Sequence, residues 1–311
     1  MRVFITGGAG FIGSHLADTL LARGDEVLVV DNFSTGRRDN LQPNEHLELV
    51  EGDIADRDLM LSLVADFAPE VIVHAAASYK DPTAWHSDAL TNVVGTANVV
   101  QAASEAGCRR LIYFQTALCY GVLPLEQPIT LEHPLRPEDS SYAISKTAGE
   151  QLIGLSGLDF VSFRLANAYG PRNMSGPLPT FYHRLNNAKP CFVMDTRRDF
   201  IYIDDLVECV MPAIDGRGQG CFHISSGSDY SIQELFDAVV ATIGIELDEP
   251  VEVRPRSADD AYTILLDPAR TEQEFGWAVS TQLPEGVQKA IAYYEQYGIS
   301  ETYTHLKGVA E

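Results

Sequence analysis

Short runs of consecutive apolar residues alternate with longer amphipathic stretches through the first half of the chain. The apolar runs are mostly continuous, which is typical of parallel strands that helices cover on both faces. We expect strands at 3–6, 27–31, 47–50, 71–74, 111–114 and 160–163, and helices at 12–23, 57–67, 85–106 and 141–155. Parallel strands joined by right-handed helical crossovers form a doubly wound sheet. The pattern therefore predicts an α/β fold.

The regular alternation ends after Asn167, where prolines follow at positions 171, 177, 179 and 190. Beyond them the chain shows short strand patterns and well-capped helices, such as the capping box Ser231-Ile232-Gln233-Glu234. We predict a first domain over 1–167 and a smaller, less regular lobe over 168–311. The segment at about 200–222 is expected to return to the first domain.

The first strand leads directly into a glycine-rich turn, Thr6-Gly7-Gly8-Ala9-Gly10-Phe11-Ile12-Gly13. Glycines let the backbone turn tightly and approach a pyrophosphate, whose charge lies at the positive N-terminal end of the next helix. The order of strand, glycine turn, helix and strand predicts a dinucleotide-binding Rossmann unit.

The second strand ends on Asp31, close to the offset of about 20 residues at which a carboxylate accepts hydrogen bonds from the adenosine ribose. A carboxylate would repel a 2′-phosphate at that position, so NAD is favoured over NADP. Arg37 and Arg38 follow closely, and binding of a 2′-phosphate by these arginines is the competing interpretation.

The chain of 311 residues carries a formal net charge of −22, which argues against nucleic acids and anionic membrane surfaces as partners. An anionic small ligand would need a local group of basic residues. The five cysteines show no CxxC spacing, which favours free thiols in a reducing compartment over disulfides or a metal site. With no leader pattern and no membrane-length apolar run, we expect a cytoplasmic protein.

Tyr142 and Lys146 are four residues apart, and therefore share one face of the helix predicted at 141–155. A nearby ammonium group and a nicotinamide cation would favour the phenolate and make Tyr142 a base near neutral pH. The alternative is an ordinary exposed helix pair. Thr116 ends the fifth strand, where its hydroxyl either bonds a substrate hydroxyl or caps a turn.

Together these residues resemble the extended short-chain dehydrogenase/reductase superfamily, specifically its nucleotide-sugar epimerases and dehydratases of the UDP-glucose 4-epimerase type. The resemblance covers nearly the whole chain and includes Asp31-Asn32-Phe33-Ser34-Thr35-Gly36, Gly52-Asp53-Ile54, His74-Ala75-Ala76-Ala77, Asn92-Val93-Val94-Gly95-Thr96, Arg164-Leu165-Ala166-Asn167-Ala168-Tyr169-Gly170-Pro171-Arg172 and Arg198-Asp199-Phe200-Ile201-Tyr202-Ile203-Asp204-Asp205.

By this resemblance, the residues from Asp31 to Gly36 surround the adenosine ribose, and Asp53 and Ile54 contact adenine. Ala75, Ala76, Ala77 and Asn92 line the cofactor path, and Lys146 also reaches the nicotinamide ribose. The residues that match positions holding the substrate's diphosphate or nearby groups are Asn167, Arg198 and Arg256. They would supply the basic group that the acidic composition requires.

The residues after Thr116 distinguish reactions within this family. Dehydratases resemble Thr-Asp-Glu at this point, and uronate decarboxylases typically carry a glutamate two places after Thr or Ser. Here those places hold Ala117 and Leu118. The resemblance therefore implies a 4-epimerase acting through a 4-keto sugar, on a UDP-sugar for surface polysaccharide synthesis. A dehydratase or other keto-sugar enzyme, a net alcohol oxidoreductase and a catalytically silent NAD-binding regulator remain as alternatives.

The same resemblance implies a homodimer, in which the helices at 85–106 and 141–155 of two subunits form a four-helix bundle. Small and apolar residues occur at helical spacing on the expected face: Ala89, Val93, Ala97, Val100, Ala148 and Leu152. The alternative is that these side chains pack only on the sheet of their own subunit.

Overall fold

The computed structural model describes residues 1–78, 83–256, 260–299 and 302, and its largest element is a parallel sheet of seven strands. The strand order is β11-β6-β5-β4-β1-β2-β3. These strands are β1 (Arg2–Thr6), β2 (Glu26–Asp31), β3 (Leu47–Glu51), β4 (Val71–His74), β5 (Arg110–Thr116), β6 (Phe160–Leu165) and β11 (Gly220–Ile224). The predicted α/β class with a doubly wound parallel sheet is confirmed.

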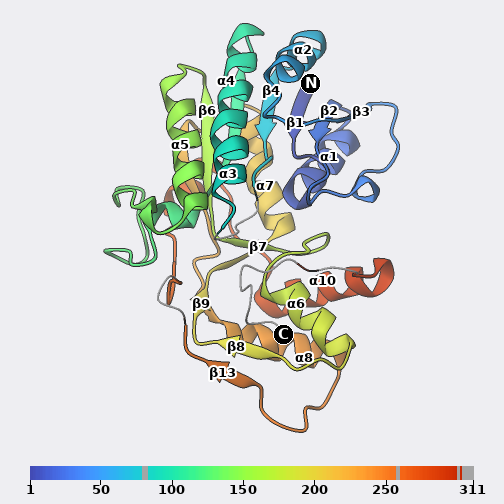
Figure 1. Cartoon of the computed structure of the whole chain (residues 1–311), viewed down its shortest axis with the longest axis vertical. Coiled ribbons are helices and arrows are strands. Elements are labelled where there is room, and N and C mark those ends of the chain that lie inside the picture. The colour runs from blue at the N-terminus through green and yellow to red at the C-terminus, as the bar shows by residue number, and fades with distance from the viewer. Residues whose placement is uncertain (79–82, 257–259, 300–301, 303–311) are drawn as a thin grey trace.

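Helices cover both faces of this sheet (Figure 1). On one face lie α1 (Phe11–Arg23) and α7 (Ile203–Ile214), and on the other lie α2 (Arg57–Phe67), α4 (Thr96–Glu105) and α5 (Ser141–Leu155). Along β1, Val3 and Ile5 enter the first apolar layer and Phe4 enters the second. Both sides of each central strand are thus buried, which explains the continuous apolar runs in the sequence.

The stretch expected as one helix over 85–106 changes its winding along its length. It begins as α3 (Trp85–Asp88), continues as a π-helical segment (Ala89–Gly95) and becomes α4. Asn92 lies within the wide π-helical turns. Such turns often occur at functional sites, and the local apolar spacing does not reveal them.

The chain after β6 forms pairs of short strands packed with helices. The strand pairs are β7 (Asn167–Tyr169) with β10 (Phe200–Tyr202), β8 (Phe192–Met194) with β13 (Glu252–Arg254), and β9 (Arg197–Arg198) with β12 (Tyr230–Ser231). The helices are α6 (Pro177–Asn186), α8 (Ile232–Ile243), α9 (Ala269–Phe275) and α10 (Leu283–Tyr297). The capping box predicted at Ser231 and Glu234 is present at the start of α8. Short 3-10 turns cover Arg38–Asn40, Ala117–Tyr120 and Pro137–Asp139.

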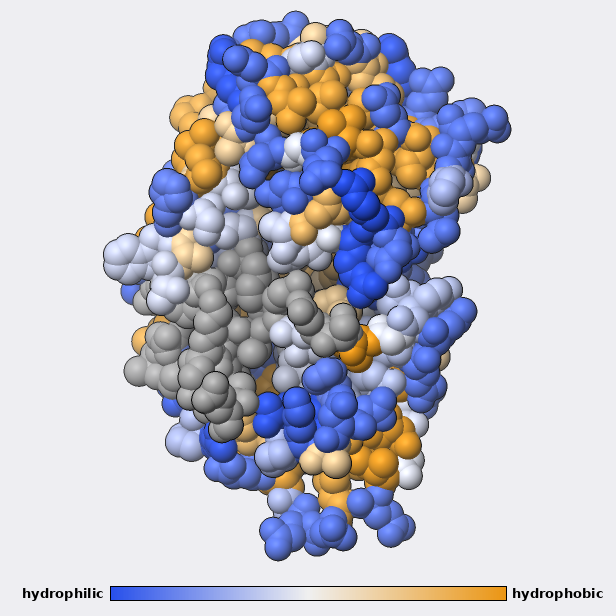
Figure 2. Space-filling model, turned by 45° about the vertical axis from the view of Figure 1, so that its right-hand side comes forward, coloured by the Kyte–Doolittle hydropathy of each residue, from blue (hydrophilic) through white to orange (hydrophobic). Residues whose placement is uncertain are grey.

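The segment after β10 rejoins the sheet, because α7 packs against it and β11 pairs with β6. In Figure 1, α6, α8, β8 and β13 lie below the half that carries the sheet. On the face shown in Figure 2, apolar side chains gather over that upper half. Across the ranges described, the helices are each too short or too polar to cross a lipid bilayer.

Candidate active site at the carboxyl edge of the sheet

The glycine-rich turn between β1 and α1 packs too closely for side chains. Gly7 has φ of +67°, and a Cβ there would lie 2.7 Å from Ala76 Cα. A Cβ on Gly13 would lie 2.3 Å from the carbonyl oxygen of Gly7. Gly10, Phe11 and Ile12 complete the passage into α1. The turn therefore presents backbone without side chains at the N-terminus of α1, where a pyrophosphate can approach closely.

Asp31 ends β2 and stabilises the glycine-rich turn from the side. Its carboxylate accepts backbone hydrogen bonds from Ala9 at 2.9 Å and from Phe33 at 2.8 Å. Burial raises the pKa of Asp31, and these backbone donors oppose that shift. A Cβ on Gly36 would lie 2.7 Å from the Asp31 carboxylate, so a side chain there would displace that carboxylate.

Two arginines that offered an alternative for a 2′-phosphate are both paired with acids. Arg37 donates to Asp39 at 2.6 and 2.9 Å, and Arg38 donates to Glu51. All four of these side chains are largely exposed. A 2′-phosphate would have to replace these acidic partners.

The other predicted cofactor residues lie along the same edge. Asn32 donates to Asp53 at 3.0 Å, and the backbone amide of Ser34 donates to the Asn32 side chain at 3.0 Å. Thr35 lines the cavity described below, and so does Ala77 in the run from Ala75 after β4. Ile54 is 4 % exposed and packs where Gly95 has no side chain, which places most of it in the core.

Asn92 joins two segments that are distant from each other in sequence. Its side-chain oxygen accepts from the Ser78 amide at 2.9 Å, and its nitrogen donates to Ser145 Oγ at 3.0 Å. Ser145 lies on α5 between Tyr142 and Lys146. The π-helical segment is thereby hydrogen-bonded to the turn of α5 that carries the proposed base.

Lys146 is buried on α5, with 2 % of its surface exposed. Its Nζ lies 4.1 Å from the centroid of the Tyr113 ring on β5. Burial lowers the pKa of Lys146 to about 7, and the carboxylate of Glu150 one turn further along α5 opposes that shift. The ammonium form is therefore supported by an aromatic face and a buried acid, as a cation in an apolar environment requires.

A cavity of about 500 Å³ lies at the carboxyl edge of the sheet, and Lys146 is not among the described residues that line it. Four of the predicted catalytic and substrate residues line it: Thr116, Tyr142, Asn167 and Arg198. Thr116 Oγ1 also accepts from the backbone amide of Leu118 at 3.2 Å, so this threonine both faces the cavity and caps a turn. Ala117 and Leu118 line the same wall and present no acid.

Several lining residues were not identified from the sequence. They include Ser78, Arg184, Phe192 and Asp260. Arg184 lies in the last turn of α6, and this helix packs on α8. A basic residue on an otherwise amphipathic helix carries no sequence signal that separates a ligand contact from a solvated surface.

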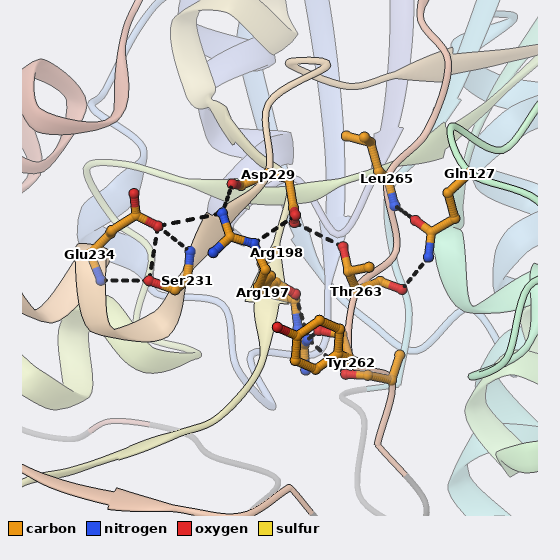
Figure 3. Close-up of polar contacts among 10 residues, drawn as sticks. Gln127, Arg197, Arg198, Asp229, Ser231, Glu234, Tyr262, Thr263 and Leu265 are labelled. Atoms are coloured by element: carbon orange, nitrogen blue, oxygen red, sulfur yellow. Dashed lines mark hydrogen bonds and ion pairs between the residues drawn. The ribbon is translucent and has the colours of Figure 1, made fainter.

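The two arginines assigned to a diphosphate both contact Asp260. Arg198 Nη2 donates to both carboxylate oxygens, at 2.8 and 2.9 Å, and Arg256 Nη1 donates to the backbone carbonyl at 2.8 Å. Arg256 itself is exposed and is not among the described residues that line the cavity. Arg197, the preceding residue on β9, pairs instead with Asp229 and Glu234, as Figure 3 shows.

Comparisons with known proteins identify relatives over most of the chain. The chain matches the model of the NAD dependent epimerase/dehydratase family over residues 3–222. It is 35% identical over 316 residues to a UDP-glucose 4-epimerase of Mycolicibacterium smegmatis, covering 94% of this chain and 98% of that protein. Among solved structures, the Bordetella bronchiseptica enzyme WbmH in complex with NAD+ is 53% identical with a TM-score of 0.93, covering 96% of this chain and 99% of that one. WbmG from the same organism, in complex with NAD and UDP, is 45% identical with a TM-score of 0.92 and 99% coverage of both chains.

Proposed function

Because the chain belongs to the NAD-dependent epimerase/dehydratase family, we propose that it is a nucleotide-sugar 4-epimerase that acts through a transient 4-keto sugar. NAD is its cofactor, and the substrate we propose is a UDP-sugar used in surface polysaccharide synthesis. The observation that carries this proposal is one cavity lined by both Thr116 and Tyr142, with apolar residues at positions 117 and 118 and with the buried Lys146 one helical turn from Tyr142.

Tyr142 is the proposed base that removes the proton of the 4-hydroxyl group. The buried ammonium of Lys146, one helical turn away, favours the phenolate form of Tyr142. Thr116 faces the same cavity, where its hydroxyl orients the 4-oxygen and shares its proton. The glycine-rich turn and Asp31 would hold NAD, which would supply reversible hydride transfer at C4. The 4-keto sugar would rotate in the cavity between the two transfers, so that the hydride returns to its opposite face.

The apolar wall after Thr116 favours epimerisation over the other reactions of the family. Elimination of water across C5 and C6 needs an acid and a base beside the sugar, and Ala117 and Leu118 provide neither. The alternative is a dehydratase or other keto-sugar enzyme whose acid comes from elsewhere in the cavity. A net alcohol oxidoreductase and a silent NAD-binding regulator are weaker alternatives, since Tyr142 and Lys146 are both present.

Incubation of the purified protein with a panel of nucleoside diphosphate sugars tests the proposal. We expect NMR spectra of one UDP-sugar to show a product that differs only in configuration at C4. A product that has lost water would instead support a dehydratase, and a product that has lost carbon dioxide would support a decarboxylase. No conversion of any sugar, with NAD bound, would favour the regulator.

The part of the chain after residue 167 is proposed as the substrate lobe, apart from the segment at about 200–222. Asn167 begins β7, and its side chain donates to the Asp199 carbonyl at 3.2 Å. Arg198 faces the cavity from β9. We propose that Asn167, Arg198 and Arg256 hold the diphosphate or groups beside it, with Arg256 reaching the ligand only after local movement.

NAD is expected to stabilise the protein far more than NADP. The buried carboxylate of Asp31 lies beside the glycine turn, and Arg37 and Arg38 are already paired with Asp39 and Glu51. Thermal unfolding with equal concentrations of each cofactor measures the difference, because the ligand that binds the folded state more tightly stabilises it more. A larger shift with NADP would contradict the role of Asp31.

We also propose that two copies pair through the surface formed by the π-helical segment, α4 and α5. Of the six small and apolar residues predicted on this face, Ala89 is exposed and the other five are half-buried. Val94 and Ile144, on the same segments, are exposed by 45 % and 49 %. Such a surface is typical of an interface between subunits. Sedimentation at micromolar concentration is expected to show a dimer, and a monomer alone under those conditions would contradict the proposal.

A further inference from the structure

Asp260 occupies the place between the two arginines that we assign to a diphosphate. Arg198 donates to both of its carboxylate oxygens, and Arg256 donates to its backbone carbonyl. The side chains of Arg198 and Asp260 are only 16 % and 13 % exposed. A guanidinium group that faces a largely apolar cavity is costly without an anionic partner, and Asp260 provides that partner.

Asp260 begins a segment, residues 260–266, that is anchored differently at its two ends. Toward its C-terminal end, the Gln127 side chain donates to the Thr263 carbonyl at 3.0 Å and accepts from the Leu265 amide at 2.8 Å, as Figure 3 shows. Near the middle, Thr263 Oγ1 donates to Asp229 at 2.8 Å. At the near end, Arg198 Nη1 donates to the Ala261 carbonyl at 3.0 Å, in addition to its bonds to Asp260.

The near end of this segment forms part of the cavity wall. Asp260, Ala261 and Ile264 all line the cavity, together with Arg198. A phosphate oxygen that approaches Arg198 from the cavity therefore meets a guanidinium whose Nη2 already donates to a carboxylate. The incoming anion and Asp260 compete for the same donors.

We propose that Asp260 is an internal counter-ion of Arg198, which a diphosphate displaces and a monophosphate does not, so that Asp260 determines specificity for nucleoside diphosphates. This inference rests on the proposed function, in which Arg198 holds the diphosphate. A carboxylate attached to the chain competes at high effective concentration. A diphosphate has enough charge and oxygen atoms to replace it, whereas the phosphate of a nucleoside monophosphate satisfies too few donors.

The test measures binding of UDP and UMP by isothermal titration calorimetry to the full-length, NAD-loaded protein. Asp260→Asn keeps the size of the side chain but removes its charge. We expect it to bind UDP about tenfold more tightly than the wild type, since the charge-assisted pair no longer has to be broken. The affinity for UMP is expected to rise by a larger factor, because its phosphate can then bind Arg198, so the preference for UDP over UMP falls.

Asp229→Asn is the matched control. It removes the charge from another Arg–Asp pair, in which Arg197 Nε lies 2.7 Å from the Asp229 carboxylate. Arg197 precedes Arg198 on β9, but neither Arg197 nor Asp229 is among the described residues that line the cavity. This variant is expected to bind UDP with the affinity of the wild type.

Unchanged or weaker UDP binding by Asp260→Asn would overturn the inference. An unchanged UMP affinity would also overturn it, because Asp260 would then not exclude monophosphates. The same gains in Asp229→Asn would overturn it as well, because they would indicate a general effect of charge. Asp260→Ser gives the same expectations if the asparagine variant fails to fold. A wild type that does not bind UDP would overturn the proposed UDP-sugar site, and this inference with it.

Discussion

Replacement of Tyr142 by phenylalanine is expected to lower turnover by roughly 10²–10⁴-fold, the usual effect of losing an acid–base group. The phenol lines the cavity with Thr116, so removing its oxygen takes away the proposed proton acceptor. The ring itself remains, and we expect fold and NAD affinity to be kept. Initial rates with a UDP-sugar measure the loss, while thermal unfolding and titration with NAD check the other two properties.

Tyr230→Phe is the matched control for this substitution. Tyr230 also carries a phenol, but it lies outside the described cavity lining, with its hydroxyl 3.5 Å from Gln282. We expect turnover close to that of the wild type. A Tyr142→Phe protein that turns over as fast as this control would show that another group moves the proton.

Replacement of Lys146 by alanine is expected to reduce both turnover and NAD affinity. The buried ammonium is proposed to stabilise the Tyr142 phenolate and to reach the nicotinamide ribose, so one substitution removes two functions. Without that cation the phenol of Tyr142 should have a higher pKa. We therefore expect the acidic limb of the pH–rate profile to move to higher pH, which steady-state rates across a pH series would measure.

Lys289→Ala provides the control for loss of a lysine. Lys289 lies on α10 and forms an exposed pair with Glu285 at 2.8 Å. This variant is expected to keep NAD affinity, turnover and the wild-type pH profile. If Lys146→Ala lost turnover but kept the position of its acidic limb, the proposed electrostatic effect on Tyr142 would be wrong.

The residues expected to bind the cofactor could be proposed from the sequence because each of them has a local signal there. Gly7 and Gly13 follow a strand directly, and the structure shows that a side chain at either position would collide with backbone. Asp31 was found because it ends an apolar strand at a recognisable distance from the glycines. Tyr142 and Lys146 share a helical face by spacing alone.

The residues around the proposed substrate cavity were harder to predict because their contacts join segments that are distant in sequence. Arg198 was predicted to hold the diphosphate or nearby groups, and the structure places it in the cavity lining. Its pairing with Asp260 spans 62 residues and leaves no local signal. Arg256 was expected in the same basic group, and the structure places it outside the cavity lining because its side chain contacts the Asp260 backbone.

The central claim is that hydride leaves C4 and returns to the same carbon. UDP-glucose and UDP-N-acetylglucosamine, each deuterated at C4, should be incubated with the NAD-loaded protein, and the products analysed by NMR and mass spectrometry. For the sugar that is converted, we expect the deuterium to remain at C4 of the epimer, with no lasting NADH. Loss of the label from C4, or NADH in amounts equal to the product, would contradict the account.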